Sequence, residues 1–423
     1  MRSILEELSS AASRCALCGF CQAVCPTFLT TGMEQHGPRG RILIAGAIAN
    51  GEVEDPSFDP FYTCLGCGAC YYACPAGMSA WEVSRSARRL ARAAGREDPL
   101  SSAISSAIAS LGDPLGLGRR ELSRWSRGLG IPGPRDLPGR PILLTGHMYQ
   151  LMPYVAGLSR LRARLEGAMR AAASIAARVP RALSASALLA EARHAEVYDG
   201  YLRNIAALLR AAGVEFAYDP DEPYPGTLLH ELGHDEEFAD YARAFAGRLR
   251  RMGVGRVITV DPHTYDLLDR VYPRYVDGFD VEVLHYSELL EGLELRRLDV
   301  SVALHEPCHL VLRDRPLRSL EALLGRAAEL RIPPRSGRRN FCCGGPAELL
   351  RGRLAEEVSR RRFEELKGLG SDLIVTACPI CHLNLNKDGS AVDASEVLAA
   401  SAGLSDRVRV PRDLLRSSWR RAR

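Results

Sequence analysis

Lysine, nucleotide-binding glycine loops and long apolar runs are scarce or missing in this chain of 423 residues. Lysine occurs only as Lys367 and Lys387, and neither follows a glycine, which excludes the G-x-x-x-x-G-K-S/T phosphate loop. Residues 253–255 read Gly-Val-Gly and lack the third glycine of a dinucleotide fingerprint, so no flavin or nicotinamide site is predicted. The formal net charge of +4 is small for this length and gives no sign of a nucleic-acid partner.

The sequence also lacks the features of a membrane-spanning or secreted protein. Its apolar run at residues 42–49 is far shorter than the roughly 18 residues that cross a bilayer. Residues 1–7 are acidic and have no apolar core, so no signal peptide is predicted. We expect a cytoplasmic protein without a transmembrane segment. The arginine-rich residues 416–423 are compatible with peripheral contact to the inner face of a membrane, although a frayed, solvated tail is the simpler interpretation.

Cysteine is well represented, and the 13 cysteines fall into two groups with none between residues 74 and 308. The first group forms two runs, at residues 15–26 and 64–75, and both read C-x2-C-x2-C-x3-C-P. In this ferredoxin pattern three thiolates hold one [4Fe–4S] cluster and the fourth reaches the other cluster. The predicted ligands of the first cluster are Cys15, Cys18, Cys21 and Cys74, and those of the second are Cys64, Cys67, Cys70 and Cys25.

Zinc and disulfides fit these runs less well than iron–sulfur clusters do. Structural zinc usually takes two separated C-x2-C pairs, so four crowded cysteines in each run would be unusual. Disulfides are not expected in a chain without a secretory signal. The segment Pro38-Arg39-Gly40-Arg41, which opens an apolar helical stretch, is expected near the clusters, where arginine offsets their negative charge; a solvated helix start is the alternative.

The composition predicts a helical, cluster-binding domain over residues 1–95 and a Ser/Gly/Pro-rich linker over residues 96–140, with one helix near residues 100–111. From residue 141 onward, β-branched runs alternate with helical patterns, which indicates an α/β fold with parallel strands. Residues 253–262 align with residues 370–379 without a gap. We therefore predict two related modules, over residues 141–297 and 298–423.

The second group of five cysteines lies in the second module, at three junctions between a predicted strand and a predicted helix. Such junctions share one edge of a parallel sheet, which is the usual place for a site. We expect these cysteines to converge there: Cys308, Cys342, Cys343, Cys378 and Cys381. A zinc site that uses four of them and an empty dithiol pair are the alternatives.

This pattern of Cys308, Cys342-Cys343-Gly344 and Cys378-x2-Cys381 resembles the cysteine-rich CCG domain of the heterodisulfide reductase family. With the ferredoxin runs and the Pro-Arg-Gly-Arg segment, the whole chain is similar to the iron–sulfur subunits of glycolate oxidase and related D-lactate dehydrogenases. The resemblance implies a noncubane [4Fe–4S] cluster on the five cysteines. It also implies a flavoprotein partner that oxidises a small 2-hydroxy acid, and a quinone or other carrier as electron acceptor.

The first module departs from the CCG pattern. His147 stands where a cysteine is expected, residues 224–226 read Tyr-Pro-Gly in place of the CCG, and residues 261–264 read Asp-Pro-His-Thr. We therefore interpret this module as a degenerate CCG-type copy that holds no cluster and serves as a scaffold. The whole chain is predicted to be multidomain α+β: a ferredoxin domain followed by two tandem α/β modules.

Residues 230–234, His-Glu-Leu-Gly-His, match the H-E-x-x-H signature of zinc proteases. Pro225 and Gly226 lie just upstream, so the motif falls in a first helical turn rather than within a long helix. We interpret it as a chance match, with a metal bound by His230 and His234 as the remaining possibility. The predicted function is an iron–sulfur electron-transfer subunit. The alternatives are a disulfide reductase that acts at the third cluster, and a zinc-binding protein or metalloprotease.

Overall fold

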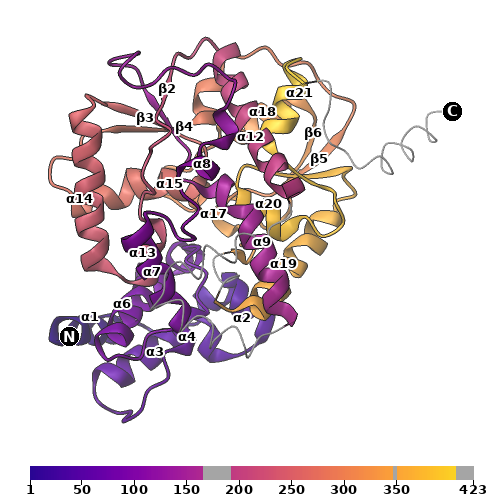
Figure 1. Cartoon of the computed structure of the whole chain (residues 1–423). Helices are drawn as coiled ribbons and strands as arrows, with labels where there is room; N and C mark the ends of the chain where they lie inside the picture. Colours follow the sequence, from indigo (N-terminus) through magenta and orange to yellow (C-terminus); the bar gives the residue numbers. More distant parts are fainter. Residues whose placement is uncertain (165–191, 346–349, 406–423) are drawn as a thin grey trace.

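The N-terminal part of the protein is helical, as its sequence predicts. The computed structural model describes residues 1–164, 192–345 and 350–405, so the arginine-rich residues 416–423 lie outside the described part. Six α-helices and two 3-10 turns build the first 95 residues: α1 (Arg2–Ser13), η1 (Phe20–Val24), α2 (Pro26–Thr31), η2 (Glu34–His36), α3 (Pro38–Ala49), α4 (Asp59–Tyr62), α5 (Ala69–Ala73) and α6 (Ala80–Ala93). In Figure 1 these helices gather at the bottom of the molecule, beneath the two sheets.

Local sequence explains where the longer helices begin and end. Ser79 caps α6 by accepting a hydrogen bond from the backbone N–H of Glu82, three residues later. Helix α7 (Pro99–Leu111) begins with a proline in its first turn after Asp98, whose carboxylate accepts from Leu100 N at 2.9 Å. Gly112, with φ of +83°, ends it. The helix expected near residues 100–111 is therefore confirmed.

Residues 96–140 are packed against the rest of the protein rather than extended between domains. The apolar face of α7 is buried, and Trp125 is 0% exposed. The indole N–H of Trp125 donates to the hydroxyl of Tyr218 at 3.2 Å, which joins this segment to the first sheet. Short turns α8 (Arg119–Leu122) and η3 (Arg124–Ser126) complete it.

The remaining chain forms two four-stranded parallel sheets, as the alternating pattern predicts. The first contains β1 (Ile142–Leu144), β2 (Ala217–Tyr218), β3 (Arg256–Thr259) and β4 (Glu282–His285), in the order β2-β1-β3-β4. The second contains β5 (Ser301–Leu304), β6 (Glu329–Arg331), β7 (Leu373–Thr376) and β8 (Ala391–Asp393), in the order β6-β5-β7-β8. Both sheets thus place their first and third strands side by side, and the aligned segments 253–262 and 370–379 contain the equivalent strands β3 and β7.

Helices cover these sheets, which is why the inner strands β1, β5 and β7 are buried along their whole length, and β3 is buried after its first residue. The first sheet is flanked by α9 (Met148–Arg164), α12 (Ala192–Ala211), α13 (Thr227–Leu232), α14 (Asp235–Arg251), α15 (Pro262–Asp266), the π-turn η4 (Leu267–Val271), α16 (Tyr272–Tyr275) and η5 (Tyr286–Leu290). The second carries α17 (Cys308–Val311), α18 (Ser319–Ala327), η6 (Gly337–Arg339), α19 (Gly352–Lys367), α20 (Pro379–Leu385) and α21 (Ala394–Ser401).

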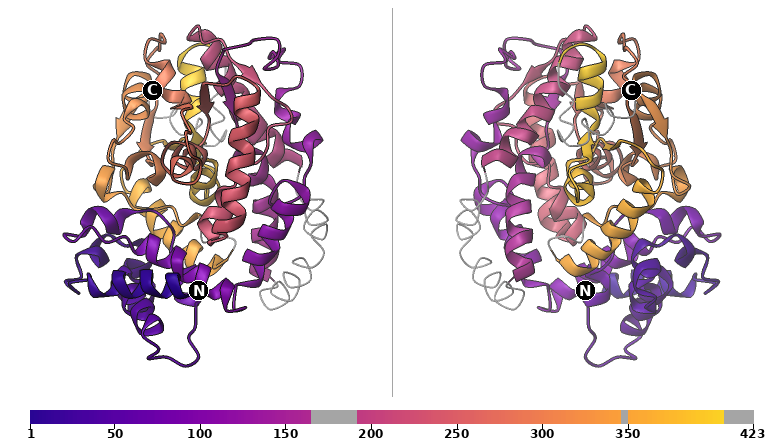
Figure 2. Two further views of the ribbon diagram at one scale, coloured as in Figure 1. Left: turned by 90° about the vertical axis from the view of Figure 1, so that its left-hand side faces the viewer. Right: turned by 90° about the vertical axis from the view of Figure 1, so that its right-hand side faces the viewer.

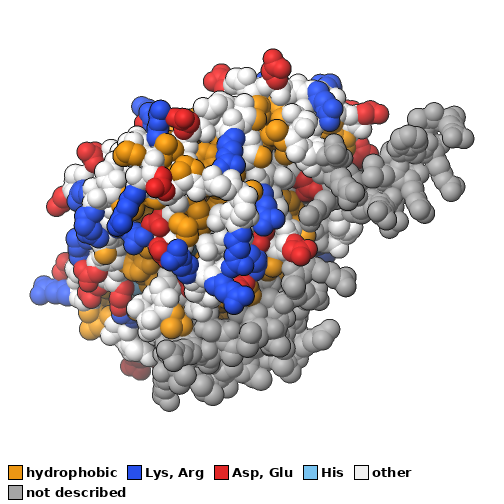
Figure 3. Space-filling model, turned by 45° about the horizontal axis from the view of Figure 1, so that its top comes forward, with side chains coloured by type: hydrophobic (Ala, Val, Ile, Leu, Met, Phe, Trp, Pro, Cys, Tyr) orange, Lys and Arg blue, Asp and Glu red, His pale blue; other side chains and the backbone are white. Residues whose placement is uncertain are grey.

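The two sheet regions are joined by helices of the first region. Helix α9 contacts α19 and α20, and α12 contacts α21. Figure 1 shows α9 and α12 between the two sheets, and both views in Figure 2 show the N-terminal helices below them. On the face drawn in Figure 3, side chains of both charge signs are interspersed, in line with the small net charge.

Candidate cluster sites

The first site is a small pocket lined by four cysteines from two distant parts of the chain. Its lining includes Cys15, Cys18 and Cys21 of the first run and Cys74 of the second, with Arg39 beside them. Burial, followed by the neighbouring thiols Cys15 and Cys74, raises the pKa of Cys21 to about 11. Thiols packed this closely repel one another when ionised, so a positively charged metal core suits the pocket.

The second site lies next to the first. Burial, followed by Cys64 and Cys25, raises the pKa of Cys70 to about 12. Cys25 is buried, and its sulfur lies 3.2 Å from the hydroxyl of Thr27. The structure thus places Cys25 near the second run and Cys74 near the first. Cys21 also adds to the raised pKa of Cys70, so the two sites are neighbours.

Two arginines hold the loops of these sites in place, and the first is Arg41. This residue is 1% exposed and donates to Pro60 O at 2.9 Å and to the hydroxyls of Thr27 and Thr63, which adjoin the two runs. The expectation that the Pro-Arg-Gly-Arg segment lies near the cysteines is confirmed. Gly40 is required because a Cβ there would lie 1.9 Å from Glu34 O.

The second is Arg88, which was not identified from the sequence, where it is one of many arginines on a helix. Its guanidinium is buried and donates to Phe61 O at 2.8 Å, to Cys64 O at 3.0 Å and to Glu231 O at 2.6 Å. It therefore links the second cysteine run to the first sheet region. Only the long-range fold brings these three carbonyls together.

The five cysteines of the second sheet region converge at the carboxyl ends of β5 and β7. Cys308 begins α17 directly after β5, and Cys378 caps α20 directly after β7. The two strands are neighbours, and the chain turns to opposite sides after them, which makes this edge a topological switch point. All five thiols are free and buried: Cys308, Cys342, Cys343, Cys378 and Cys381.

The five sulfurs form one continuous series. Thiol–thiol contacts link Cys308 to Cys342 and Cys342 to Cys343. Further contacts link Cys343 to Cys381 and Cys381 to Cys378. The geometry of the thiols therefore agrees with the expectation that these three junctions meet.

The loop that carries Cys342 and Cys343 depends on glycine. Gly344 has a φ of +87°, and a Cβ on it would lie 2.6 Å from Ala355 O in α19. A Cβ on Gly345 would lie 2.0 Å from the Ile380 side chain. These close approaches press the cysteine loop against α19 and α20 and keep both thiols at the centre of the site.

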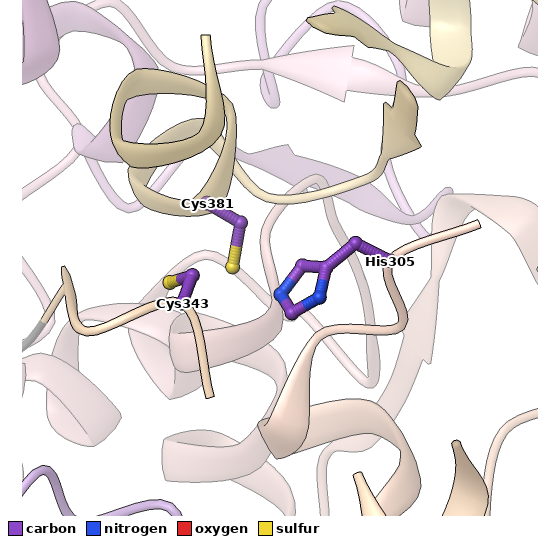
Figure 4. Close-up of side chains that lie close together, drawn as sticks. All are labelled: His305, Cys343 and Cys381. Carbon is purple, nitrogen blue, oxygen red and sulfur yellow. The ribbon is translucent and has the colours of Figure 1, made fainter. Parts of the chain in front are cut away.

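His305 also belongs to this third site, although its sequence context did not single it out. A ligand atom of His305 and the sulfurs of Cys343 and Cys381 lie within 4.8 Å of one another. Figure 4 shows the imidazole facing the two thiols. The buried Arg362 points its Nε at His305 Nδ1 at 3.1 Å, which leaves Nε2 for the cysteine side. Two thiols and one imidazole are also a ligand set that zinc accepts.

The corresponding edge of the first sheet carries no thiol. His147 follows β1 with a φ of +61°, and its Nε2 lies 3.7 Å from Oε1 of the buried Glu222. After β3, Asp261 caps α15 by accepting from His263 N at 2.9 Å and from Thr264 N at 3.0 Å. At this edge of the first sheet, His147 and Asp261 therefore make a contact with Glu222 and a helix cap, in the places where the second sheet has thiols.

The H-E-x-x-H residues do not form a protease site. His230 lies in α13 and packs against Phe238, with ring centroids 5.2 Å apart. Gly233, in the left-handed conformation, ends that helix, and His234 precedes α14. Nε2 of His234 lies 2.8 Å from Oε1 of Glu97, so the two imidazoles have different surroundings. These separate contacts do not favour the zinc-protease interpretation of the motif.

A cavity of about 900 Å³ lies where the N-terminal helices and both sheet regions meet. Cys67 of the second run and Cys308 of the third site both line it. Its walls also include Glu231, His263 and His309.

Cys378 of the third site has an acidic thiol. Contacts with Cys381 and His263 lower the pKa of Cys378 to about 6, although burial opposes this shift.

Comparison with known proteins agrees with this arrangement. Residues 11–78 match the family model of the 4Fe-4S dicluster domain, and residues 302–386 match that of the CCG cysteine-rich domain. The resemblance inferred from the two sets of cysteine motifs is therefore confirmed for these two parts of the chain. Among the described residues, no helix is long and apolar enough to cross a membrane.

Three curated relatives illustrate the similarity. A probable glycolate oxidase iron-sulfur subunit from Bacillus subtilis is 41% identical over 78 residues, which cover 18% of this chain and 17% of the relative. An EtfAB:quinone oxidoreductase from Syntrophomonas wolfei is 29% identical over 214 residues, covering 45% and 29%. One subunit of a CoB-CoM heterodisulfide reductase from Methanosarcina acetivorans is 31% identical over 115 residues, covering 25% and 38%. The matched stretches thus span well under half of each relative.

Proposed function

We propose that this chain is an iron–sulfur electron-transfer subunit of an oxidoreductase complex. The observation that carries the proposal is the continuous arrangement of its three cysteine sites. Cys21 of the first site neighbours Cys70 of the second, and Cys67 of the second neighbours Cys308 of the third. Closely spaced redox groups of this kind are what a one-electron path through a protein requires.

The neighbouring thiols also support an assignment of ligands to the two N-terminal clusters. Cys15, Cys18, Cys21 and Cys74 would hold one [4Fe–4S] cluster, and Cys64, Cys67, Cys70 and Cys25 the other. The pocket that contains Cys74 but not Cys25 supports this crossing over. The clusters supply one-electron redox chemistry when bound, and the protein supplies thiolates, burial and the nearby Arg39 and Arg41.

The third site, with its five thiols in series, suits a multinuclear iron–sulfur cluster better than a single ion. Adjacent Cys342 and Cys343 reach toward different neighbours, Cys308 on one side and Cys381 on the other. A tetrahedral zinc would use only four of these thiols and leave one buried and unmatched. We assign a noncubane [4Fe–4S] cluster to Cys308, Cys342, Cys343, Cys378 and Cys381.

We further interpret residues 141–297 as a degenerate CCG-type module and residues 298–423 as the complete one, with residues 1–95 as the ferredoxin domain and 96–140 as the connection. The two sheets have matching strand orders, which supports the interpretation that residues 141–297 and 298–423 are related modules. The edge after β1 and β3, which carries His147 and Asp261 in place of thiols, would then be a structural remnant.

The electron donor would be a separate flavoprotein that oxidises a small 2-hydroxy acid, and the acceptor a quinone or other carrier. The absence of a nucleotide fingerprint from this sequence favours substrate chemistry on another chain. The name of the Bacillus subtilis relative supports a glycolate-oxidising partner, and the name of the Syntrophomonas wolfei relative supports a quinone as acceptor.

A second candidate is a disulfide reductase that acts at the third site. The observation in its favour is the cavity of about 900 Å³ that opens beside Cys308, where a substrate could meet the cluster. The Methanosarcina acetivorans relative carries such a name.

One pair of assays separates these functions. The chain should co-purify anaerobically with a flavoprotein, and the complex should pass electrons from glycolate or D-lactate to a quinone analogue. The isolated chain, reduced with dithionite, should show no activity on disulfides. Disulfide reduction by the isolated chain that is lost in Cys343→Ser would support the second candidate instead.

A further inference from the structure

We propose that Glu231, His263 and His309 form a binding site for a divalent transition metal, separate from the three cysteine sites. One ligand atom from each residue lies within 4.8 Å of the others. The three come from separate elements, α13, α15 and α17, so the site exists only in the folded chain. Two imidazoles and one carboxylate are a common ligand set for zinc and for non-haem iron.

The neighbouring residues orient the two imidazoles as metal ligands require. His309 Nδ1 lies 2.8 Å from Oδ2 of Asp266, which leaves Nε2 as its ligand nitrogen. A carboxylate behind a ligating histidine is a common outer-shell arrangement, because it fixes the ring and raises its basicity. Asp266 is itself paired with Arg270, so its position is also fixed.

His263 and Glu231 already face each other. His263 Nδ1 lies 3.1 Å from Oε1 of Glu231, and the other side of the ring contacts Cys378. Arg88 donates to the backbone O of Glu231 at 2.6 Å, which holds the start of this side chain in place. A metal ion would take the position of the proton between Nδ1 and Oε1 and leave the contact with Cys378 intact.

The stacking of the two rings also favours a shared ion. The centroids of His263 and His309 are 4.2 Å apart. One divalent ion bound to a nitrogen of each ring would give the two stacked rings a common partner. With zinc–nitrogen distances of about 2.0–2.1 Å, the ligand atoms would draw somewhat closer together.

The site opens to a cavity, so it leaves room for further ligands. All three residues line the 900 Å³ space that also contains Cys308. Three protein ligands with open positions are typical of metal sites that bind water or a small molecule. The metal would therefore present an exchangeable position beside the third cysteine site. This use of Glu231 also differs from a zinc-protease site, because His230 and His234 take no part.

Cobalt is a suitable probe because its ligands can be read spectroscopically. Anaerobic protein with intact clusters is treated with a chelator, incubated with Co²⁺ and desalted, and cobalt and iron are counted per chain. We expect about one cobalt retained with the iron unchanged. X-ray absorption at the cobalt edge should show nitrogen and oxygen ligands with imidazole scattering and no sulfur.

Two variants and a matched control test the assignment. Glu231→Gln should weaken cobalt retention at least tenfold, and Asp266→Asn should weaken it about 10–100-fold through loss of the outer-shell contact. Glu82→Gln is the control, because Glu82 lines the same cavity but pairs with Arg85. It should retain cobalt like the wild type.

Sulfur in the first shell of wild-type cobalt would overturn the proposal, since the metal would then occupy cysteine ligands. Failure of the wild type to retain cobalt, or equal retention by Glu231→Gln, would also overturn it. The X-ray absorption spectrum of the wild type tests the predicted ligands even if a variant fails to fold. Because iron is counted separately, loss of this site and loss of the cysteine clusters are distinguishable.

Discussion

Cys67 and Cys308, 241 positions apart in the sequence, line the same cavity, and after burial the Cys308 thiol is the largest cause of the raised pKa of Cys67. This proximity brings the ferredoxin-type domain next to the cysteine-rich domain. It also sets an order for the three sites, because Cys21 of the first site is near enough to Cys70 of the second to help raise its pKa. In the electron-transfer function proposed above, electrons entering at either end would pass through the middle site.

Double variants test the crossing over of Cys25 and Cys74. If Cys18 and Cys74 serve one cluster, Cys18→Ser with Cys74→Ser should remove only that cluster and leave about eight of about twelve irons. Cys18→Ser with Cys25→Ser should damage two clusters and leave about four. Iron analysis of anaerobic protein measures both, and the reverse pattern would show that each run binds its own cluster.

The third site should be lost independently of the other two. Cys343→Ser removes the thiol that contacts both Cys342 and Cys381. We expect iron to fall from about twelve to about eight per chain, with the electron paramagnetic resonance signals of the reduced cubane clusters unchanged. Loss of zinc with constant iron would instead identify the site as a zinc site.

Arg88 should be important for stability. Arg88→Ala leaves three backbone carbonyls without their donor, two of them next to the second cluster loop. We expect a loss of about 2–4 kcal/mol in the free energy of unfolding, measured by anaerobic denaturant titration. Arg243→Ala is the control because Arg243 is exposed and, among the described residues, pairs with Asp240 of its own helix, and it should change stability by less than about 0.5 kcal/mol. Equal effects of the two variants would contradict the role of Arg88.

Glu222 should make stability depend on pH. Burial raises its pKa to about 8, although hydrogen bonds from Thr145 oppose the shift. The folded protein therefore holds a proton that the unfolded chain has lost above about pH 4.5. The free energy of unfolding contributed by this group should fall as pH rises from about 4.5 to 8, by at most about 1.4 kcal/mol per pH unit. Glu222→Gln should flatten this slope, and an unchanged slope would assign the pH dependence to other groups.

Helices and strands that depend on local sequence patterns were predicted well. The helices beginning near Pro38 and Pro99, the parallel strands and the matching positions of β3 and β7 follow from local patterns and the internal repeat. The convergence of Cys308 and Cys378 followed from the rule that parallel strands end at one edge.

Features that depend on contacts between distant segments were not predictable. Composition suggested a linker around Trp125, yet this side chain is fully buried against Tyr218. Arg88 is surrounded by similar arginines in the sequence, and only the fold shows which one is buried. The approach of Glu231 to His263 and His309 requires three elements to meet, and no local spacing signals it.

The assignment of three clusters can be decided by the iron, zinc and acid-labile sulfide content of the anaerobically purified chain, read together with its Mössbauer spectrum. We predict about twelve irons per chain, about two thirds in cubane clusters and one third in a cluster of a different type. About sixteen irons would contradict the absence of a cluster from the first sheet region. About eight irons with one zinc bound to sulfur would contradict the third cluster.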